Sequence, residues 1–88
     1  QTIGVLNMNF ESAFQDLVRS AVIVNRAYKM SKCNPNDSFF IHVRGKLYAK
    51  QLFGKSLGLD IRIKFPTDES SKLYISSVSL NEYTLKFD

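Results

Sequence analysis

The stretch FESAFQDLVRSAVIVNRAYKMS, residues 10–31, carries the strongest structural signal in the chain. Its apolar side chains recur every three or four residues, which places them on one side of an α-helix. This side consists of Phe10, Phe14, Leu17, Ala21, Val24 and Tyr28. Asn9 is a suitable N-cap because its side-chain oxygen can accept from a free first-turn amide. Pro35 disfavours the helical conformation at Asn34. The pattern therefore predicts a helix over residues 10–31 with one buried side.

Three apolar residues of this helix lie off the buried side: Val22, Ile23 and Met30. One interpretation is that another element of the same domain covers them, because helices that are apolar all round are usually buried. The other is that they form a docking patch for a protein partner or a second copy of the chain. They are the candidate protein interface.

The next segment has the alternation of a strand. Residues 34–37 form a polar turn, and residues 38–44 then place apolar side chains on alternate sides. One side of the predicted strand carries Phe39, Ile41 and Val43, and the other carries Phe40, His42 and Arg44.

Residues 45–58 allow two interpretations. Good helix formers fill residues 46–53, and Gly58 can end a helix in the left-handed conformation, which favours a short helix over 46–56. The apolar face of that helix would be Tyr48, Ala49, Leu52 and Phe53. Alternatively, Gly45 turns a hairpin and residues 46–53 return as a strand. Gly54 also weakens a helix interior.

The remaining sequence reads as β-structure. Residues 59–65 alternate apolar and polar side chains, and shorter alternations follow over 73–77 and 83–87. The whole chain is predicted to be one α+β domain, in the order α-β-α-β-β-β. A long N-terminal helix and a short second helix pack on one face of a mainly antiparallel sheet of about four strands. Residues 1–7 precede Met8 and are interpreted as vector-derived or as a flexible extension.

Composition limits the class of protein. Of 88 residues, 44% are hydrophobic, which is typical of a globular domain. No apolar run approaches the roughly 18 residues of a membrane span. The net charge is +4, and residues 37–66 carry six basic side chains against two acidic ones. The single cysteine, Cys33, fits a reducing compartment. We therefore expect a cytoplasmic protein with no membrane partner.

Catalytic and metal signatures are missing from the sequence. Catalysis by a nucleophile needs a nearby base, and the one histidine, His42, has no recognisable partners in the sequence. Zinc sites need three or four ligands at short spacings, whereas Cys33 and His42 stand alone. No glycine-rich phosphate loop is present. The sequence predicts a non-enzyme without cofactor or metal, and no motif specific to a known family stands out.

Two binding functions remain. The first is a small regulator, adaptor or inhibitor that acts through a protein–protein surface, by self-association or with a different partner. The second is nucleic-acid binding by a sheet face on which aromatic rings and cations alternate, since bases stack on rings and phosphates meet Lys or Arg. The candidate nucleic-acid face consists of Phe40, His42, Arg44, Arg62, Lys64, Tyr74 and Lys86. A small enzyme is the third and least favoured interpretation.

Overall fold

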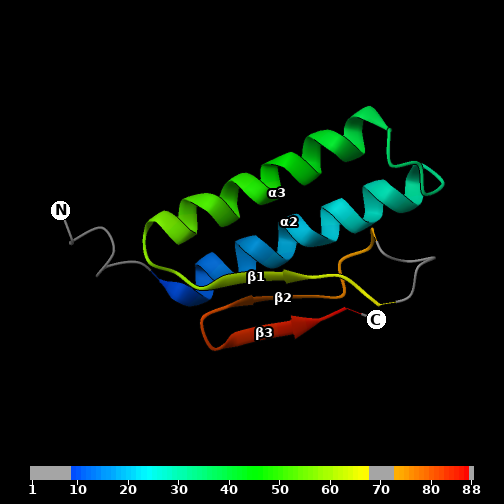
Figure 1. Cartoon of the computed structure of the whole chain (residues 1–88). Helices are drawn as coiled ribbons and strands as arrows, with labels where there is room; N and C mark the ends of the chain where they lie inside the picture. Colours follow the sequence, from blue (N-terminus) through cyan, green and yellow to red (C-terminus); the bar gives the residue numbers. More distant parts are fainter. Residues whose placement is uncertain (1–8, 68–72, 88) are drawn as a thin grey trace.

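The computed structural model describes residues 9–67 and 73–87. Two helices, α2 (Phe10–Met30) and α3 (Ser38–Ser56), pack together on one face of a three-stranded antiparallel sheet (Figure 1). The strands are β1 (Ile61–Lys64), β2 (Ser77–Leu80) and β3 (Tyr83–Lys86), in the spatial order β1-β2-β3. The predicted α+β class is confirmed, with three strands where about four were expected.

Helix α2 follows the sequence pattern closely. The Asn9 side chain accepts from the Ser12 amide at 3.1 Å, as expected of an N-cap. The predicted side is buried against the rest of the molecule except for Phe10, which is partly exposed. The helix ends at Met30 because Lys32 and Cys33 adopt the left-handed conformation, and the Cys33 amide reaches back to the Tyr28 carbonyl at 3.0 Å.

The predicted strand over residues 38–44 is wrong, because these residues form the first two turns of α3. Asp37 caps that helix, since its carboxylate accepts from the Phe40 amide at 2.9 Å. Phe40, Val43 and Leu47 then recur at helical spacing and are buried. The turn that contains Asp37 thus starts a helix, and the order of elements becomes α-α-β-β-β.

The C-terminal half of α3 settles the ambiguity of residues 46–56 in favour of the helix. Gly58 has a φ of +87°, and the following Leu59 amide bonds to the Gly54 carbonyl at 3.0 Å. This is the left-handed helix end that the sequence predicts. The hairpin interpretation is wrong, because Gly45 lies inside the helix.

The sheet is built from two short hairpin pairings. Ile61 pairs with Leu80, and Leu80 pairs in turn with Tyr83, so the inward side chains of the three strands form rows. Asn81 turns the β2–β3 hairpin with a φ of 54°. Strand β2 starts at Ser77, where the predicted strand over 73–77 ends. The prediction therefore placed this strand too early in the sequence, by about the length of the strand.

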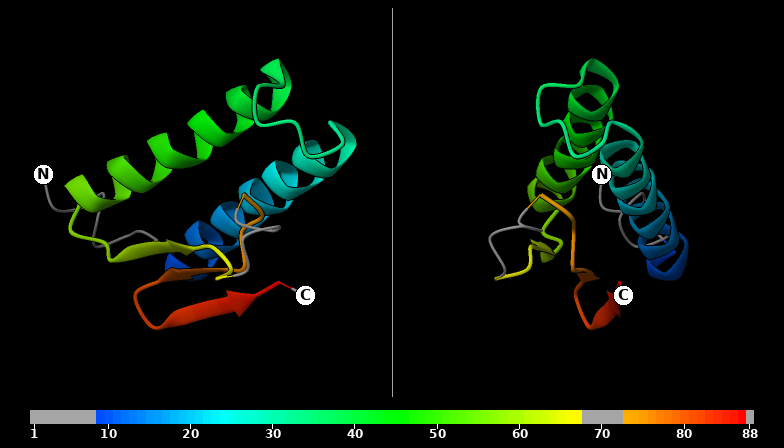
Figure 2. Two further views of the ribbon diagram at one scale, coloured as in Figure 1. Left: turned by 45° about the vertical axis from the view of Figure 1, so that its right-hand side comes forward. Right: turned by 90° about the vertical axis from the view of Figure 1, so that its right-hand side faces the viewer.

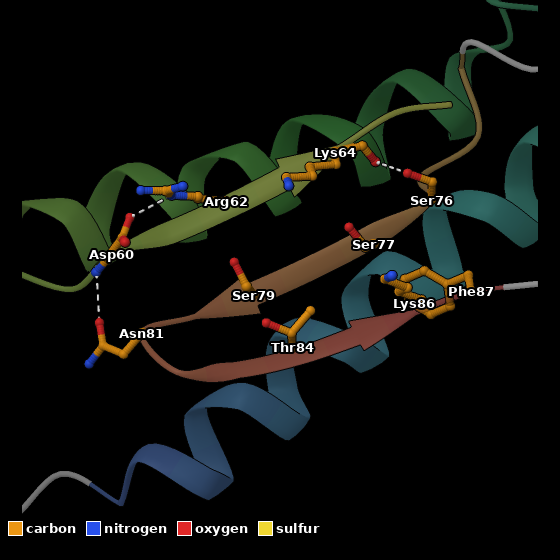
Figure 3. Close-up of a pocket in the computed structure, with 10 residues that line it drawn as sticks. All are labelled: Asp60, Arg62, Lys64, Ser76, Ser77, Ser79, Asn81, Thr84, Lys86 and Phe87. Carbon is orange, nitrogen blue, oxygen red and sulfur yellow. Dashed lines mark hydrogen bonds and ion pairs between the residues drawn. The ribbon is translucent and has the colours of Figure 1, made fainter. Parts of the chain in front are cut away.

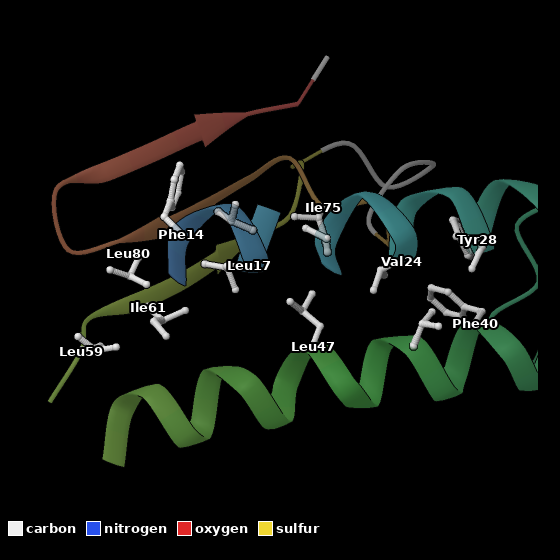
Figure 4. Close-up of a cluster of buried hydrophobic side chains, with 14 residues drawn as sticks. Phe14, Leu17, Val24, Tyr28, Phe40, Leu47, Leu59, Ile61, Ile75 and Leu80 are labelled. Carbon is white, nitrogen blue, oxygen red and sulfur yellow. The ribbon is translucent and has the colours of Figure 1, made fainter. Parts of the chain in front are cut away.

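The core lies between the two helices and the inner sheet face (Figure 4). Its largest fully buried side chains are Phe40, Leu47, Leu80, Val24 and Val78. Two amides tie the layers together. Asn25 of α2 donates to the Ile75 carbonyl at 3.0 Å and accepts from the Ile75 amide at 2.7 Å. Gln51 of α3 donates to the Ile61 carbonyl at 3.0 Å. The helices are therefore held on one face, and no described segment covers the opposite one (Figure 2).

Candidate interaction surfaces

The residues predicted to form a nucleic-acid face do not gather on one surface. Phe40 is fully buried in the core, where its ring lies 4.9 Å from that of Tyr28. His42 and Arg44 lie on α3 and not on the sheet, and the Arg44 guanidinium stands 5.4 Å from the centre of the Phe40 ring. This placement corrects the prediction, and its cause is the helix that replaces the predicted strand.

Tyr74 is also separated from the outer face of the sheet. Its ring packs edge-on against Tyr28 at 4.9 Å, and its hydroxyl lies 3.5 Å from the Cys33 sulfur. The hydrogen bond with Cys33 raises the pKa of the Tyr74 phenol. Tyr74 therefore packs against the C-terminal end of α2. Its ring does not lie on the outer face of the sheet, where a nucleobase could stack on it.

The other three predicted residues, Arg62, Lys64 and Lys86, do come together. They line a hollow of about 600 Å³ on the outer face of the sheet (Figure 3). The register explains the grouping, because Lys64 and Lys86 both pair with Ser77 across the sheet and so share its face. We call this the outer sheet face. Its remaining lining residues are Asp60, Ser76, Ser77, Ser79, Asn81, Thr84 and Phe87.

The chemistry of the outer sheet face suits an anion more than a nucleobase. Ser79 and Thr84 are paired and place hydroxyls between the cations, and Ser77 is only 9% exposed. Asp60 partly neutralises the face, since its carboxylate lies 3.2 Å from Arg62 Nε. Phe87 is the one ring that lines the hollow. Hydroxyls and cations can contact phosphate, but stacking of successive bases needs more rings.

Helix α3 carries a second surface that the sequence did not place correctly. Tyr48, Ala49, Leu52 and Phe53, predicted as its buried apolar face, are half-buried or exposed. Leu52 is 68% exposed and Phe53 is 67% exposed. The helix therefore has apolar side chains both towards the core and away from it.

The exposed residues follow a helical stripe roughly opposite the buried side of α3, with Phe53 at its edge, where it lines a cleft towards α2. Ile41 continues the stripe towards the N-terminus and is 46% exposed. We define the outer face of α3 as the set Ile41, Gly45, Ala49, Leu52 and Phe53. Helical spacing of four, four, three and one residues keeps these positions within one broad side of the helix.

The charge of α3 has one sign. The helix contains Arg44, Lys46, Lys50 and Lys55 and no acidic residue. Among the described residues, Lys50 is the α3 cation with a salt bridge, to Asp16 at 2.8 Å, and it also donates to Ser20 at 2.7 Å. The outer face of α3 is thus an apolar stripe with cations on its flanks.

Tyr48 marks the boundary between the outer face of α3 and the interior. Its side chain is half-buried, one turn after Arg44. Burial raises the pKa of the Tyr48 phenol above its ordinary value of 10.0, and the Arg44 cation partly opposes this increase.

The candidate interface Val22, Ile23 and Met30 is not covered by another described element. Met30 is 84% exposed at the end of α2, Ile23 is 43% exposed, and Val22 is half-buried. Ile23 lines a small groove between α2 and α3, of about 160 Å³, to which Val43 also contributes. Val22 and Met30 do not line that groove, so the structure does not bring the three residues into one hollow.

An apolar cleft lies next to the outer face of α3. Its volume is about 180 Å³, and Phe53 and Leu57 of the α3 end face Leu17 of α2 across it. The salt bridge between Asp16 and Lys50 borders the cleft. The cleft extends the apolar surface of α3 towards α2 and has space for a side chain.

Within the described parts of the chain, no three His, Cys, Asp or Glu side chains are grouped so that they could hold a metal ion. None of the described helices is both long enough and apolar enough to cross a bilayer. Comparison with known proteins found no match among protein-family models, curated proteins or solved structures. A proposal on function therefore rests on the surfaces of the described residues.

Proposed function

We propose that this chain is a small non-enzymatic binding module, a regulator, adaptor or inhibitor, that presents the outer face of α3 to a protein partner. The observation that carries the proposal is the exposure of Ile41, Leu52 and Phe53 along one side of a helix whose other side is already buried. Single exposed apolar residues are ordinary on protein surfaces. Several on one helix face are typical of an interface.

The energetics favour burial of this surface by a partner. Fully burying a Leu or Phe side chain contributes about 1.5–3 kcal/mol, and Leu52 and Phe53 each retain about two-thirds of their exposure. Aromatic residues are also enriched at interfaces, and so is Arg. The exposed thiol of Cys33 is compatible with the reducing cytoplasm, which is where we place this function.

Site-specific photo-crosslinking tests the proposal. A photoreactive amino acid at position 52 is expected to crosslink a defined protein in the cells that make this chain. The same group at position 15, an exposed site on α2 outside the candidate surfaces, serves as the control for random collisions. Leu52→Lys should remove the crosslinked protein from a purified binding assay without changing the thermal midpoint. Equal crosslinking at both positions, or none at position 52, would contradict the proposal.

A second candidate function, nucleic-acid binding, is supported by one observation. Arg62, Lys64 and Lys86 share a hollow with hydroxyl groups on the outer sheet face. Such a surface would hold the phosphate backbone without reading base sequence, because the rings predicted for stacking lie elsewhere.

Fluorescence anisotropy with single-stranded DNA, duplex DNA and RNA tests this second candidate. The double variant Lys64→Glu/Lys86→Glu should abolish binding, and the affinity of the wild-type protein should fall steeply between about 50 and 200 mM salt. The variant Lys29→Glu/Lys32→Glu, at the C-terminal end of α2, makes the same change of charge. Its affinity should stay closer to that of the wild-type protein. Equal losses in the two variants would mean that only net charge matters.

A further inference from the structure

The two glycines inside α3 differ in what surrounds them. A Cβ at Gly54 would overlap Ile61 Cδ1, so this glycine allows α3 to lie close to β1. A Cβ at Gly45 would have no described atom within 4 Å. The two positions are nine residues, or two and a half helical turns, apart and therefore face opposite sides. Glycine weakens a helix interior relative to alanine. Packing among the described residues explains Gly54 but not Gly45.

We infer that a helix of the partner protein crosses α3 at Gly45. This inference rests on the proposed function, because it names the occupant of the same outer face of α3. Gly45 and Ala49 are small, exposed and one turn apart, and the larger Ile41 and Leu52 lie one turn before Gly45 and one turn after Ala49. Helix axes approach to about 8–10 Å depending on the side chains at the crossing, so small residues allow the closest contact.

The cations on either side of Gly45 and Ala49 indicate which charge the partner helix should carry. Arg44, Lys46 and Lys55 flank the apolar stripe, and α3 has no acidic residue of its own. A partner helix with an apolar stripe and Asp or Glu on its flanks would complement both features. Opposite charges at an interface rim speed association and exclude wrong partners.

The same charges argue against a second copy of this chain as the occupant. Two α3 helices packed face to face would bring Lys46 and Arg44 of one copy near the same cations of the other. Like charges placed opposite each other destabilise a complex. A partner strand is also disfavoured, because the outer face of α3 is a helix surface and offers no free backbone hydrogen bonds for strand addition.

A synthetic peptide provides the probe. It is a labelled 20-residue helix of Leu, Ala and Glu, with Leu at helical spacing and Glu on both flanks. A second peptide carries Lys in place of every Glu. Fluorescence anisotropy with the full chain should show binding of the Glu peptide and none of the Lys peptide. The double variant Lys46→Glu/Lys55→Glu should reverse this preference. Vesicles of equal parts phosphatidylcholine and phosphatidylserine test an anionic membrane as the alternative occupant.

The variant Gly45→Gln tests the crossing point. It adds bulk without charge, replaces glycine with a better helix former, and should leave the thermal midpoint equal or higher. Binding of the Glu peptide should weaken about tenfold or more, because the helices can no longer approach. Gln15→Ala, at an exposed position of α2 outside the candidate surfaces, is the control and should bind as the wild type.

The outcomes separate this inference from the proposed function. Wild-type affinity in Gly45→Gln overturns the crossing at Gly45. Failure of the Glu peptide, with a protein still crosslinked at position 52, overturns the acidic helix but leaves the protein-binding function in place. Binding to the vesicles alone overturns the helix as occupant. Loss of both the peptide and the crosslink overturns the inference and the proposed function together.

Discussion

Helices α2 and α3 are nearly equal in length, with 21 and 19 residues, but they use their surfaces differently. α2 is amphipathic, and most of its apolar residues lie on the side that faces the core. α3 buries Phe40 and Leu47 and also exposes Leu52 and Phe53 on other sides. A helix that satisfies only its own core needs one apolar side. Packing among the described residues therefore does not explain the second apolar side of α3.

This difference also decides what the sequence can predict. A period of 3.6 residues is visible in α2 because most residues off its buried side are polar, although Val22, Ile23 and Met30 are apolar. Around the start of α3, Phe39, Phe40, Ile41 and Val43 are all apolar, so the segment fits a period of two as well as a helical period. Exposed apolar residues next to a core face thus hide the pattern of the core.

The largest expected effect is at the buried side of α3. Phe40→Ala should lower the free energy of unfolding by about 3–5 kcal/mol, because a fully buried ring leaves a cavity between the helices. That loss is a large part of the roughly 5–15 kcal/mol that holds a domain folded. Urea denaturation followed by circular dichroism measures it.

Phe39→Ala is the matched control, one residue earlier on the same helix. Phe39 is mainly exposed, so its removal should change the free energy of unfolding by no more than about 0.5 kcal/mol. The pair also separates helix from strand, since the strand interpretation put Phe39 with the apolar residues and Phe40 on the side facing solvent. A larger loss at Phe39 than at Phe40 would contradict the packing of α3.

The α+β class and all of α2 could be predicted from the sequence, because local signals and the core pattern agree there. The start of α3 could not, although one signal was present. Asp37 follows a turn and precedes an apolar run, as an N-cap does, and the interpretation as a plain turn missed it. The position of β2 was missed because Leu73 and Ile75 alternate like a strand but lie before it. Buried irregular segments and short strands share that pattern.

The next expected effect compares the two glycines of α3. Gly54→Ala should lower the free energy of unfolding by about 1–2 kcal/mol, because strain against Ile61 exceeds the gain in helix propensity. Gly45→Ala should raise it by about 0.5–1 kcal/mol, because nothing opposes the new Cβ. Thermal unfolding of both variants measures the difference. A loss at Gly45 would mean that this glycine has a role inside the chain.

The candidate surfaces were only partly predictable. Arg62, Lys64 and Lys86 were grouped correctly because alternation within strands fixes which side chains share a face. The outer face of α3 was missed, since its residues were assigned to the core or to a strand. The sequence did carry one relevant signal, since residues 38–59 contain four basic side chains and no acidic one.

The smallest expected effect lies at the boundary between the two sides of α3. Because burial raises the pKa of Tyr48 above 10.0, the folded chain keeps this proton at a pH where the unfolded chain loses it. The stabilising contribution is therefore complete below pH 10.0 and is lost as the pH rises through the folded pKa. Tyr48→Phe should reduce the alkaline fall in stability. Arg44→Gln should raise the pKa further in an ultraviolet titration, because it removes the opposing cation. An unchanged titration in Arg44→Gln would contradict the electrostatic effect of Arg44 on Tyr48.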